Sequence, residues 1–292
     1  MCIDLALVHF ELEIQQMTRY QTQLSSASTP DGDLTLDIRE AVATITIGRP
    51  SKINAIRLST WQALRSLVAA ADSNPAVGLI VVRGSGKHFS AGNDIAALSE
   101  FPGHIADAQV FAAAWADAIQ AVEDAVKPVI MAIEGVCYGS ALALSLAGDL
   151  RIASASAVFS IPVAKLGALY LRSDYQRLVA TIGMGQSKKL IYSSETVGAE
   201  QALRIGLVDE VFPEERFEAE LQRLAETILT RSPFTLLRSK AMLRELGHGG
   251  ITRETSESLA AFAEATQSED FAEGISAFLT RRTARFRRTG AS

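Results

Sequence analysis

Two glycine-bearing turns are the part of this sequence whose residue types could do chemistry through the main chain. The first reads His-Phe-Ser-Ala-Gly-Asn-Asp-Ile at residues 88–95, and the second reads Glu-Gly-Val-Cys-Tyr-Gly-Ser-Ala at residues 134–141. Small residues at such bends let the backbone approach a ligand closely, and the first N–H groups of a helix have no internal partner. Two such turns facing one point would offer two N–H donors to one oxygen atom, which is the geometry of an oxyanion hole.

The elements that must position these turns are predicted from hydrophobic periodicity. It indicates strands over 34–38, 42–47, 79–83, 128–133, 151–153, 157–160 and 207–212, and helices over 58–71, 105–126 and 139–147. Ser59 is the expected N-cap of the first of these helices. The alternation of strands and helices predicts an α/β chain with parallel strand pairs.

Three regions are predicted along the chain, whose 292 residues suit one large domain with an appended helical end. Residues 1–33 are expected to form a flexible arm that ends in a linker of small and polar residues over 25–33. Residues 34–214 form the predicted core. Residues 215–292 form a C-terminal helical region, because the sequence there is typical of helices alone.

Composition and charge argue against several classes of function. Lys and Arg number 28 against 33 Asp and Glu, and the net charge of −5 gives no support to nucleic-acid binding. Cys2 and Cys137 are too few and too far apart for a disulfide framework or a metal site. No spacing suggests a metal, flavin or nucleotide cofactor. No apolar run reaches the length of a membrane span, and the start of the chain lacks the pattern of a signal peptide. These features predict a cytoplasmic globular protein.

An ordered series of motifs resembles the crotonase (enoyl-CoA hydratase/isomerase) superfamily from about residue 34 to residue 288. The matching segments are 49–50 with 54–55, 89–95, 127–129 with 135, 148–153, 176–178, 199–202 with 206–211, and 276–278 with 281–282. The resemblance implies a crotonase-like spiral of ββα turns, with two roughly perpendicular sheets and C-terminal helices used in trimerisation. It also implies an acyl-CoA thioester as the substrate and a homotrimer or hexamer as the assembly.

The same resemblance assigns roles to individual residues. The backbone N–H groups of Asn93 and Ser140 would hold an enolate oxygen. The second turn usually carries consecutive glycines in the family, and here it reads Gly139-Ser140-Ala141. Coenzyme A, which is part of the substrate rather than a separate cofactor, would contact residues of the N-terminal motifs and one residue near the C-terminus: Lys52, Ile53, Ala55, Arg57, Ala91, Asp94, Ile95 and Arg281.

Three positions at which members of the family carry a catalytic carboxylate hold apolar residues here, namely Ala143, Val163 and Leu171. Water addition needs a general base and a general acid within hydrogen-bond reach, and these side chains supply neither. Tyr170 falls where family decarboxylases of malonyl-type thioesters place a tyrosine. It is the third candidate catalytic residue, and it could orient a substrate carboxylate that Arg172 would attract.

The leading hypothesis is therefore an acyl-CoA enzyme that stabilises an enolate. Decarboxylation or isomerisation is favoured over standard hydration. The alternative is a non-catalytic acyl-CoA carrier or sensor, which would keep the CoA-facing turns without the carboxylates. A hydrolase of a non-CoA diketone is a third hypothesis, and it predicts no effect of neutralising Lys52, Arg57 or Arg281. Asp174 is interpreted as the N-cap of the helix that contains 176–178, with a role as a base as the alternative.

Overall fold

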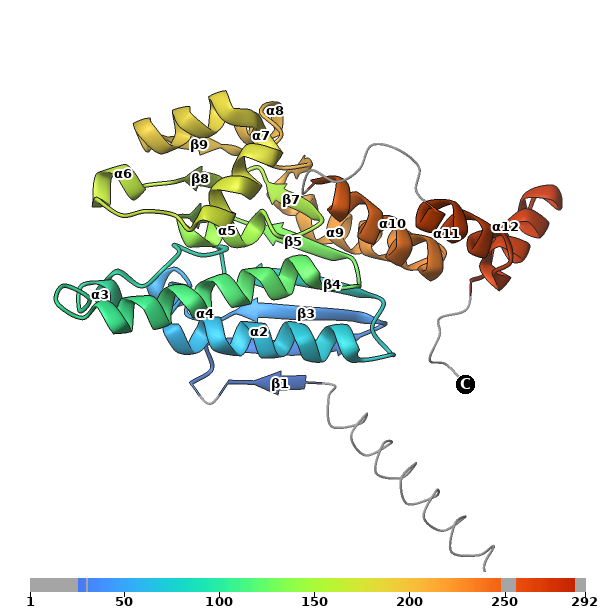
Figure 1. Cartoon of the computed structure of the whole chain (residues 1–292), viewed down its shortest axis with the longest axis horizontal. Coiled ribbons are helices and arrows are strands. Elements are labelled where there is room, and N and C mark those ends of the chain that lie inside the picture. The colour runs from blue at the N-terminus through green and yellow to red at the C-terminus, as the bar shows by residue number, and fades with distance from the viewer. Residues whose placement is uncertain (1–25, 30, 248–255, 287–292) are drawn as a thin grey trace, which may run out of the picture.

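A seven-stranded sheet forms the centre of the fold (Figure 1). The structure is a computed structural model that describes residues 26–29, 31–247 and 256–286. Within these residues the strand order is β1 (Ser26–Ser28), β2 (Leu34–Arg39), β3 (Val42–Ile47), β4 (Leu79–Gly84), β5 (Val129–Ile133), β7 (Leu150–Ser154) and β10 (Glu210–Phe212). The pairs among β1, β2 and β3 are antiparallel, and the pairs from β3 to β10 are parallel. The predicted α/β class with parallel pairs is confirmed.

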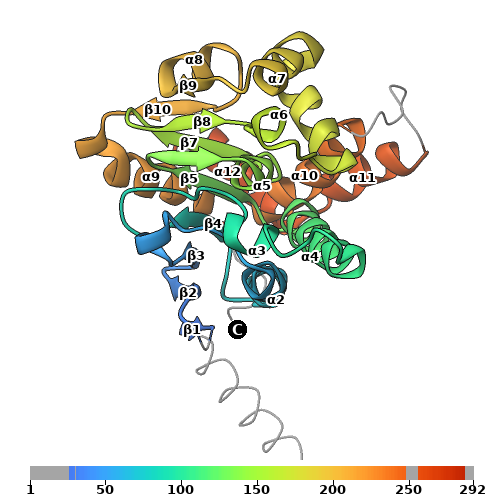
Figure 2. The same cartoon turned by 90° about the vertical axis from the view of Figure 1, so that its left-hand side faces the viewer.

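The middle of this sheet is buried on both faces. The helices α2 (Leu58–Ser73) and α4 (Ile105–Asp124) pack side by side over one face, and α9 (Glu214–Leu229) covers the other face (Figure 2). Successive residues of a strand point to opposite faces. Ile80 and Val82 of β4 therefore join the core beneath α2 and α4, whereas Leu79 and Val81 pack with Phe217 of α9. This burial explains why β4 is a continuous apolar run instead of an alternating one.

A second, three-stranded sheet consists of β6 (Val136–Tyr138), β8 (Val158–Ser160) and β9 (Thr196–Gly198). β6 pairs with β8 in parallel, and β8 pairs with β9 antiparallel. The chain passes from β5 to β6 across Glu134 and Gly135, and Gly135 has a φ of 52°. Glycine adopts this left-handed conformation at little cost. The switch between sheets therefore takes place at the start of the second glycine-bearing turn.

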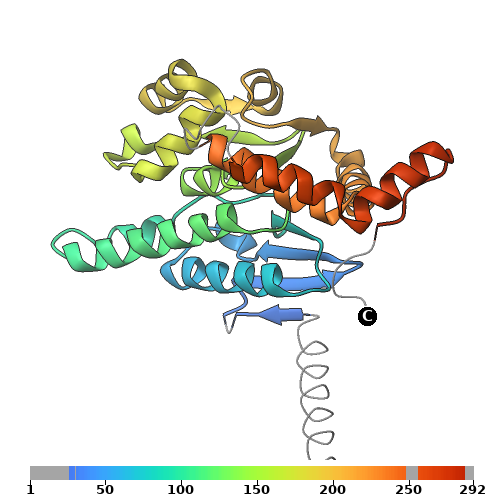
Figure 3. The ribbon, with the colours of Figure 1, turned by 45° about the vertical axis from the view of Figure 1, so that its right-hand side comes forward.

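The remaining helices, which include a C-terminal group, complete the described residues. The bounds are η1 (Pro50–Lys52), α3 (Ile95–Leu98), α5 (Ser140–Ser145), α6 (Val163–Leu166), α7 (Arg172–Ser193), α8 (Ala199–Arg204), α10 (Pro233–Gly247), α11 (Ser256–Thr266) and α12 (Glu269–Leu279). α11 and α12 extend beyond the sheet on the side away from α3 and α6 (Figures 1 and 3). None of the helices that the structure describes is both long enough and apolar enough to cross a bilayer.

Some local predictions are corrected by the structure. The predicted linker over 25–33 contains β1, which pairs with β2, and Asp33 in it is only 3% exposed. Most of the predicted arm, residues 1–25, lies outside the described residues. The N-cap of α2 is Arg57 and not Ser59. β10 begins at Glu210, so the strand predicted over 207–212 is shorter than expected. The predicted boundary at residue 214 coincides with the first residue of α9, which nevertheless packs on the large sheet.

Candidate active site

The two glycine-bearing turns lie side by side in the structure. Ser90 and Cys137 form an isolated parallel bridge, in which the Ser90 N–H donates to the Val136 carbonyl at 2.9 Å and the Tyr138 N–H donates to the Ser90 carbonyl at 3.0 Å. Gly92 has a φ of 86°, and a Cβ added there would lie 2.5 Å from the Tyr138 carbonyl oxygen and 3.1 Å from the Ser140 nitrogen. Only glycine allows this close approach of two backbones. The folding of β4, β5 and β6 thus brings the predicted pair of turns together.

Two backbone N–H groups are left without an acceptor where the turns meet. Among the hydrogen bonds of the described residues, neither the Asn93 N–H nor the Ser140 N–H has a partner. The peptide that carries the Asn93 N–H is fixed through its carbonyl, because the Ile56 N–H donates to the Gly92 oxygen at 2.8 Å. Ser140 is the first residue of α5, where an N–H has no acceptor within the helix. Unpaired donors of this kind can bind an anionic oxygen.

Both residues line a cavity of about 710 Å³ whose wall is mainly apolar and aromatic. The contributing segments are the first turn and α3, the loop and first turns of α4, the start of α5, and residues 162–171. Val163 and Leu171 lie on the wall, whereas Ala143 is fully buried in α5 and does not. No Asp, Glu, His, Lys or Arg is among the described residues that form the wall. The cavity therefore offers hydrogen-bond donors but no ionisable carboxyl or imidazole.

Tyr170 forms part of the cavity wall, and its hydroxyl faces the second turn. The hydroxyl donates to the Gly139 carbonyl oxygen at 2.5 Å, and the side chain is buried. Its ring packs edge-on against Trp115, with the ring centroids 6.2 Å apart. Burial raises the pKa of the Tyr170 hydroxyl well above its usual range, and the nearby Asp174 adds to this effect. Tyr170 is thus a neutral hydrogen-bond donor that is already bound to the peptide that carries the Ser140 N–H.

Asp174 and Arg172 do not lie where their predicted roles, a helix N-cap and a contact to the substrate carboxylate, would require. The N-cap of α7 is Leu171, and Asp174 is a buried residue of the first helical turn that pairs with Arg177 at 3.3 Å. The interpretation of Asp174 as an N-cap is therefore wrong. One of its carboxylate oxygens is buried without a hydrogen-bond partner. Arg172 is exposed and is not part of the cavity wall. Burial raises the pKa of Asp174 to about 6, despite the attraction of Arg177.

The buried Asp174 predicts a pH-dependent stability. Its pKa is about 6 in the folded chain against an ordinary 3.8, so folding favours the protonated form. The stability that this preference contributes is complete below pH 3.8 and is lost as the pH rises through 6. The loss amounts to about 3 kcal/mol. Urea denaturation should show the unfolding free energy of the wild-type chain falling by this amount between pH 3 and 8, relative to Asp174→Asn. Parallel pH profiles for the two proteins would contradict the prediction.

Comparison with known proteins gives the family. The model of the family described as enoyl-CoA hydratase/isomerase matches residues 37–289. The crotonyl-CoA hydratase of Syntrophomonas wolfei is 33% identical over 255 residues, which cover 87% of this chain and 97% of that protein. The chain belongs to the enoyl-CoA hydratase/isomerase family. The resemblance to the crotonase superfamily is thereby confirmed, and members of this family are enzymes of acyl-CoA thioesters.

Further proteins are similar to this chain in sequence and in fold. The 2,3-dehydroadipyl-CoA hydratase of Escherichia coli is 29% identical over 255 residues, which cover 87% of this chain and 98% of that protein. The crystal structure of an enoyl-CoA hydratase/isomerase family protein from Hyphomonas neptunium superimposes with a TM-score of 0.83 and 34% identity, covering 88% of this chain and 98% of that one. The expected crotonase-like fold with C-terminal helices is confirmed.

Only some of the residues that the family resemblance predicts to contact CoA lie close together in the structure. Ala91 and Ile95 line the cavity, and Ile95 begins α3. Lys52 and Ile53 are exposed at the end of η1, and Ala55 is a buried residue whose carbonyl accepts a hydrogen bond from Arg49 at 2.9 Å. The Ala91 N–H donates to the Ile53 carbonyl at 2.8 Å, so these two segments lie next to each other.

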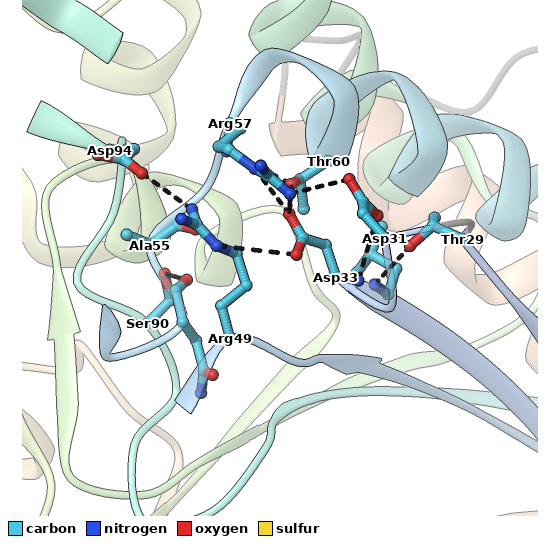
Figure 4. A network of polar contacts seen from close by, with 11 residues as sticks. Thr29, Asp31, Asp33, Arg49, Ala55, Arg57, Thr60, Ser90 and Asp94 are labelled. Carbon is cyan, nitrogen blue, oxygen red and sulfur yellow. Dashed lines mark hydrogen bonds and ion pairs between the residues drawn. The ribbon is translucent and has the colours of Figure 1, made fainter. Parts of the chain in front are cut away.

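Asp94 and Arg57 are already engaged in ion pairs (Figure 4). Asp94 caps α3 and pairs with Arg49 at 2.9 Å, and the guanidinium of Arg49 lowers the pKa of Asp94. Arg57 contacts Asp33 at 2.5 Å and Asp31 at 2.8 Å, and hydrogen bonding to Asp33 raises the pKa of Arg57. The carboxylates of Asp31 and Asp33 in the same chain therefore compensate the positive charge of Arg57.

Arg281 is not brought to the other predicted CoA residues. It is exposed and follows α12, and α12 lies on the side of the molecule away from α3 and α6 (Figure 1). Sequence reasoning also missed two residues whose side chains donate hydrogen bonds to the first turn. Arg49 stands in the first motif beside Pro50, and Trp61 has the helical spacing typical of a core residue, so neither residue is distinguished in the sequence as part of the site. Within the described residues, no cluster of three or more His, Cys, Asp or Glu has the arrangement of a metal site.

Proposed function

We propose that this chain binds an acyl-CoA thioester with its carbonyl oxygen at the Asn93 and Ser140 N–H groups and converts it through an enolate by decarboxylation, without adding water. One observation carries the proposal. Two N–H groups without a partner lie on the wall of an apolar cavity of about 710 Å³ whose described lining holds no carboxyl or imidazole. Such a site can stabilise an oxyanion but supplies no strong base.

Decarboxylation matches what these groups can do. The bond between Cα and the carboxylate of a malonyl-type thioester breaks, carbon dioxide leaves, and the electron pair of that bond forms the enolate. The negative charge moves onto the thioester oxygen, where the two N–H donors hold it. Water then delivers a proton to Cα, so the protein needs no general base. Isomerisation, by contrast, requires a base that moves a proton between two carbons.

The relatives from Syntrophomonas wolfei and Escherichia coli are hydratases, and hydration is the reaction from which this chain departs under the proposal. Ala143, Val163 and Leu171 stand where the family resemblance places carboxylates, and none of them can activate water. The same observation favours one alternative, a non-catalytic carrier or sensor that keeps an acyl-CoA in the cavity. The two functions differ in whether the thioester is changed.

Mass-spectrometric turnover against a panel of malonyl-type, enoyl and saturated acyl-CoA thioesters separates these functions. We expect loss of carbon dioxide from at least one malonyl-type thioester and no hydration of crotonyl-CoA. Hydration of crotonyl-CoA as the fastest reaction of the panel would contradict it. Tight stoichiometric binding, with every thioester recovered intact, would identify the carrier or sensor instead.

Tyr170 supports the second N–H donor in this proposal. Its hydroxyl donates to the carbonyl of the peptide whose nitrogen is Ser140 N, and hydrogen bonds on a carbonyl polarise the same peptide's N–H. Tyr170→Phe should lower kcat for decarboxylation about fivefold, which corresponds to one hydrogen bond of about 1 kcal/mol. Tyr175→Phe is the matched control, because the Tyr175 hydroxyl contacts the Tyr170 N–H and not the turn. Equal kcat values for the two variants would refute this role of Tyr170.

Lys52 is a predicted CoA contact that forms no ion pair within the described residues, unlike Arg57. It is exposed at the end of η1, whereas Arg57 is paired with two aspartates. A lysine ammonium forms charge-assisted hydrogen bonds with phosphate oxygens. Lys52→Ala should weaken the binding of CoA about tenfold, as measured by titration calorimetry. Lys188→Ala removes an exposed lysine of α7 and should leave the affinity unchanged. Unaltered affinity in Lys52→Ala would favour the hydrolase of a non-CoA substrate.

The assembly that fits this function is a homotrimer or a hexamer. Large apolar side chains are exposed on the C-terminal helices, including Leu243, Phe262 and Phe278, at 66%, 72% and 81%. An exposed apolar surface of this kind is suited to a contact with further copies of the chain. Because Arg281 follows α12 and is not among the residues that line the cavity of its own chain, an Arg281 contact with CoA would use the cavity of another copy.

A further inference from the structure

We infer that Trp61 and the hydroxyl of Ser140 are positioning residues that hold the two N–H donors in place through the side chain of Asn93. This inference rests on the proposed function, since it concerns how the oxyanion hole keeps its geometry. Neither side chain needs to touch a substrate to act in this way. They act through Asn93, whose N–H is one of the two donors.

Two hydrogen bonds converge on one oxygen atom. The Trp61 indole N–H donates to Asn93 Oδ1 at 3.0 Å, and the Ser140 hydroxyl donates to the same Oδ1 at 2.8 Å. An amide carbonyl oxygen has two lone pairs, so both are used. The bonds join three parts of the chain that are distant in sequence, namely α2, the first turn and the start of α5.

The donor in α2, the Trp61 side chain, is held rigidly. Trp61 is fully buried, and its ring stacks on Trp115 with centroids 6.3 Å apart and planes inclined by 17°. Trp115 in turn lies on α4, which packs against α2. A side chain enclosed on this scale has a single rotamer. The position of the indole N–H, and with it the position of Asn93, is therefore set by the helical layer of the core.

The other bond fixes the second donor relative to the first. Asn93 and Ser140 carry the two unpaired N–H groups, and the hydroxyl bond joins these same two residues across the gap between the turns. A glycine at position 140, as the family resemblance would give, has no side chain to form this bond. Donors that are fixed before the substrate arrives need no reorganisation when charge develops on the oxygen. Ser140 thus compensates, through its side chain, for a turn that lacks the second glycine.

The absorption spectrum of bound cinnamoyl-CoA reports whether the two N–H groups donate hydrogen bonds to the thioester oxygen. Hydrogen bonds to the thioester oxygen draw electron density along the conjugated acyl group and move its absorption to longer wavelength. The wild-type protein should show this red shift relative to cinnamoyl-CoA in buffer. Ser140→Ala and Trp61→Phe each remove one bond to Asn93 and keep both N–H donors. Each should show a smaller red shift and a kcat about five- to tenfold lower, with KM within about twofold of wild type.

Ser145→Ala is the matched control. Ser145 is a buried serine of the same helix α5, and its hydroxyl donates to the Leu142 carbonyl at 2.7 Å instead of to Asn93. This variant should keep the full red shift and kcat. A full red shift and unchanged kcat in both Ser140→Ala and Trp61→Phe would overturn the inference alone. Cinnamoyl-CoA that binds the wild-type protein without a red shift would overturn the proposed function, and the inference with it.

Discussion

Replacement of Gly92 by alanine is expected to lower kcat/KM at least about 100-fold and to destabilise the chain by about 3 kcal/mol. The added Cβ would lie 2.5 Å from the Tyr138 carbonyl oxygen and 3.1 Å from Ser140 N, which are backbone atoms of the second turn. Backbone atoms cannot rotate away as the end of a flexible side chain can. The two turns must therefore separate, and the Asn93 and Ser140 N–H groups would separate with them.

Gly103→Ala separates this clash from the cost of an unusual backbone conformation. Gly103 has a φ of 84°, close to the 86° of Gly92, but a Cβ there would meet no heavy atom within 4 Å. Alanine in this left-handed conformation costs about 1–2 kcal/mol at either position. Gly103→Ala should therefore lose this amount in urea denaturation and keep its kcat/KM within a few-fold of wild type. Equal losses of stability and activity in the two variants would show that the contact between the turns is unimportant.

Ser140→Pro is the second change with a large expected effect, because it removes a backbone donor that no other substitution can delete. Proline has no N–H, and kcat/KM should fall about 100- to 1000-fold relative to Ser140→Ala, which keeps the donor. The comparison cancels the loss of the hydroxyl, since both variants lack it. Steady-state kinetics on the thioester that the wild-type protein converts fastest measures the difference.

The local backbone accepts proline at this position. Ser140 is the first residue of α5, where proline is well tolerated because its missing N–H has no helical partner. The preceding residue is Gly139, with φ of 54° and ψ of −126°, and it has no Cβ to clash with the proline ring. A circular dichroism spectrum and melting temperature close to those of Ser140→Ala are therefore expected. Equal activity of the two variants would exclude the Ser140 N–H as a catalytic donor.

Much of the fold could be predicted because its elements have strong local patterns. β3 alternates over the expected residues 42–47, β4 is an apolar run one residue longer than the predicted 79–83, and α2 and α4 carry apolar residues at helical spacing. β1 could not be predicted in this way, because Ser-Ala-Ser at 26–28 has no apolar pattern and becomes a strand only by pairing with β2. β9 is likewise three residues long and depends on its pairing with β8. Such strands are determined by tertiary contacts that periodicity does not reveal.

The candidate site was predictable where it depends on the main chain and less so where it depends on side-chain partners. The turns at 88–95 and 134–141 meet as expected, because they end neighbouring segments of the fold. The pairing of Arg57 with Asp31 and Asp33 was not foreseeable, since both aspartates belong to a stretch that reads as a linker. The hydrogen bond from Trp61 to Asn93 crosses 32 residues of sequence, and its only signal was a tryptophan at a core position.

The carbonyl stretching frequency of bound butyryl-CoA, labelled with ¹³C at the thioester carbon, shows whether the Asn93 and Ser140 N–H groups donate to the thioester oxygen. Isotope-edited infrared difference spectra isolate this one bond, and two N–H donors on its oxygen lower its frequency. We expect a lower frequency in the wild-type protein than in water, most of that shift in Ser140→Ala, and a clear return toward higher frequency in Ser140→Pro. A frequency in the bound wild-type complex no lower than in water, or one that Ser140→Pro leaves unchanged, would contradict an oxyanion hole at Asn93 and Ser140.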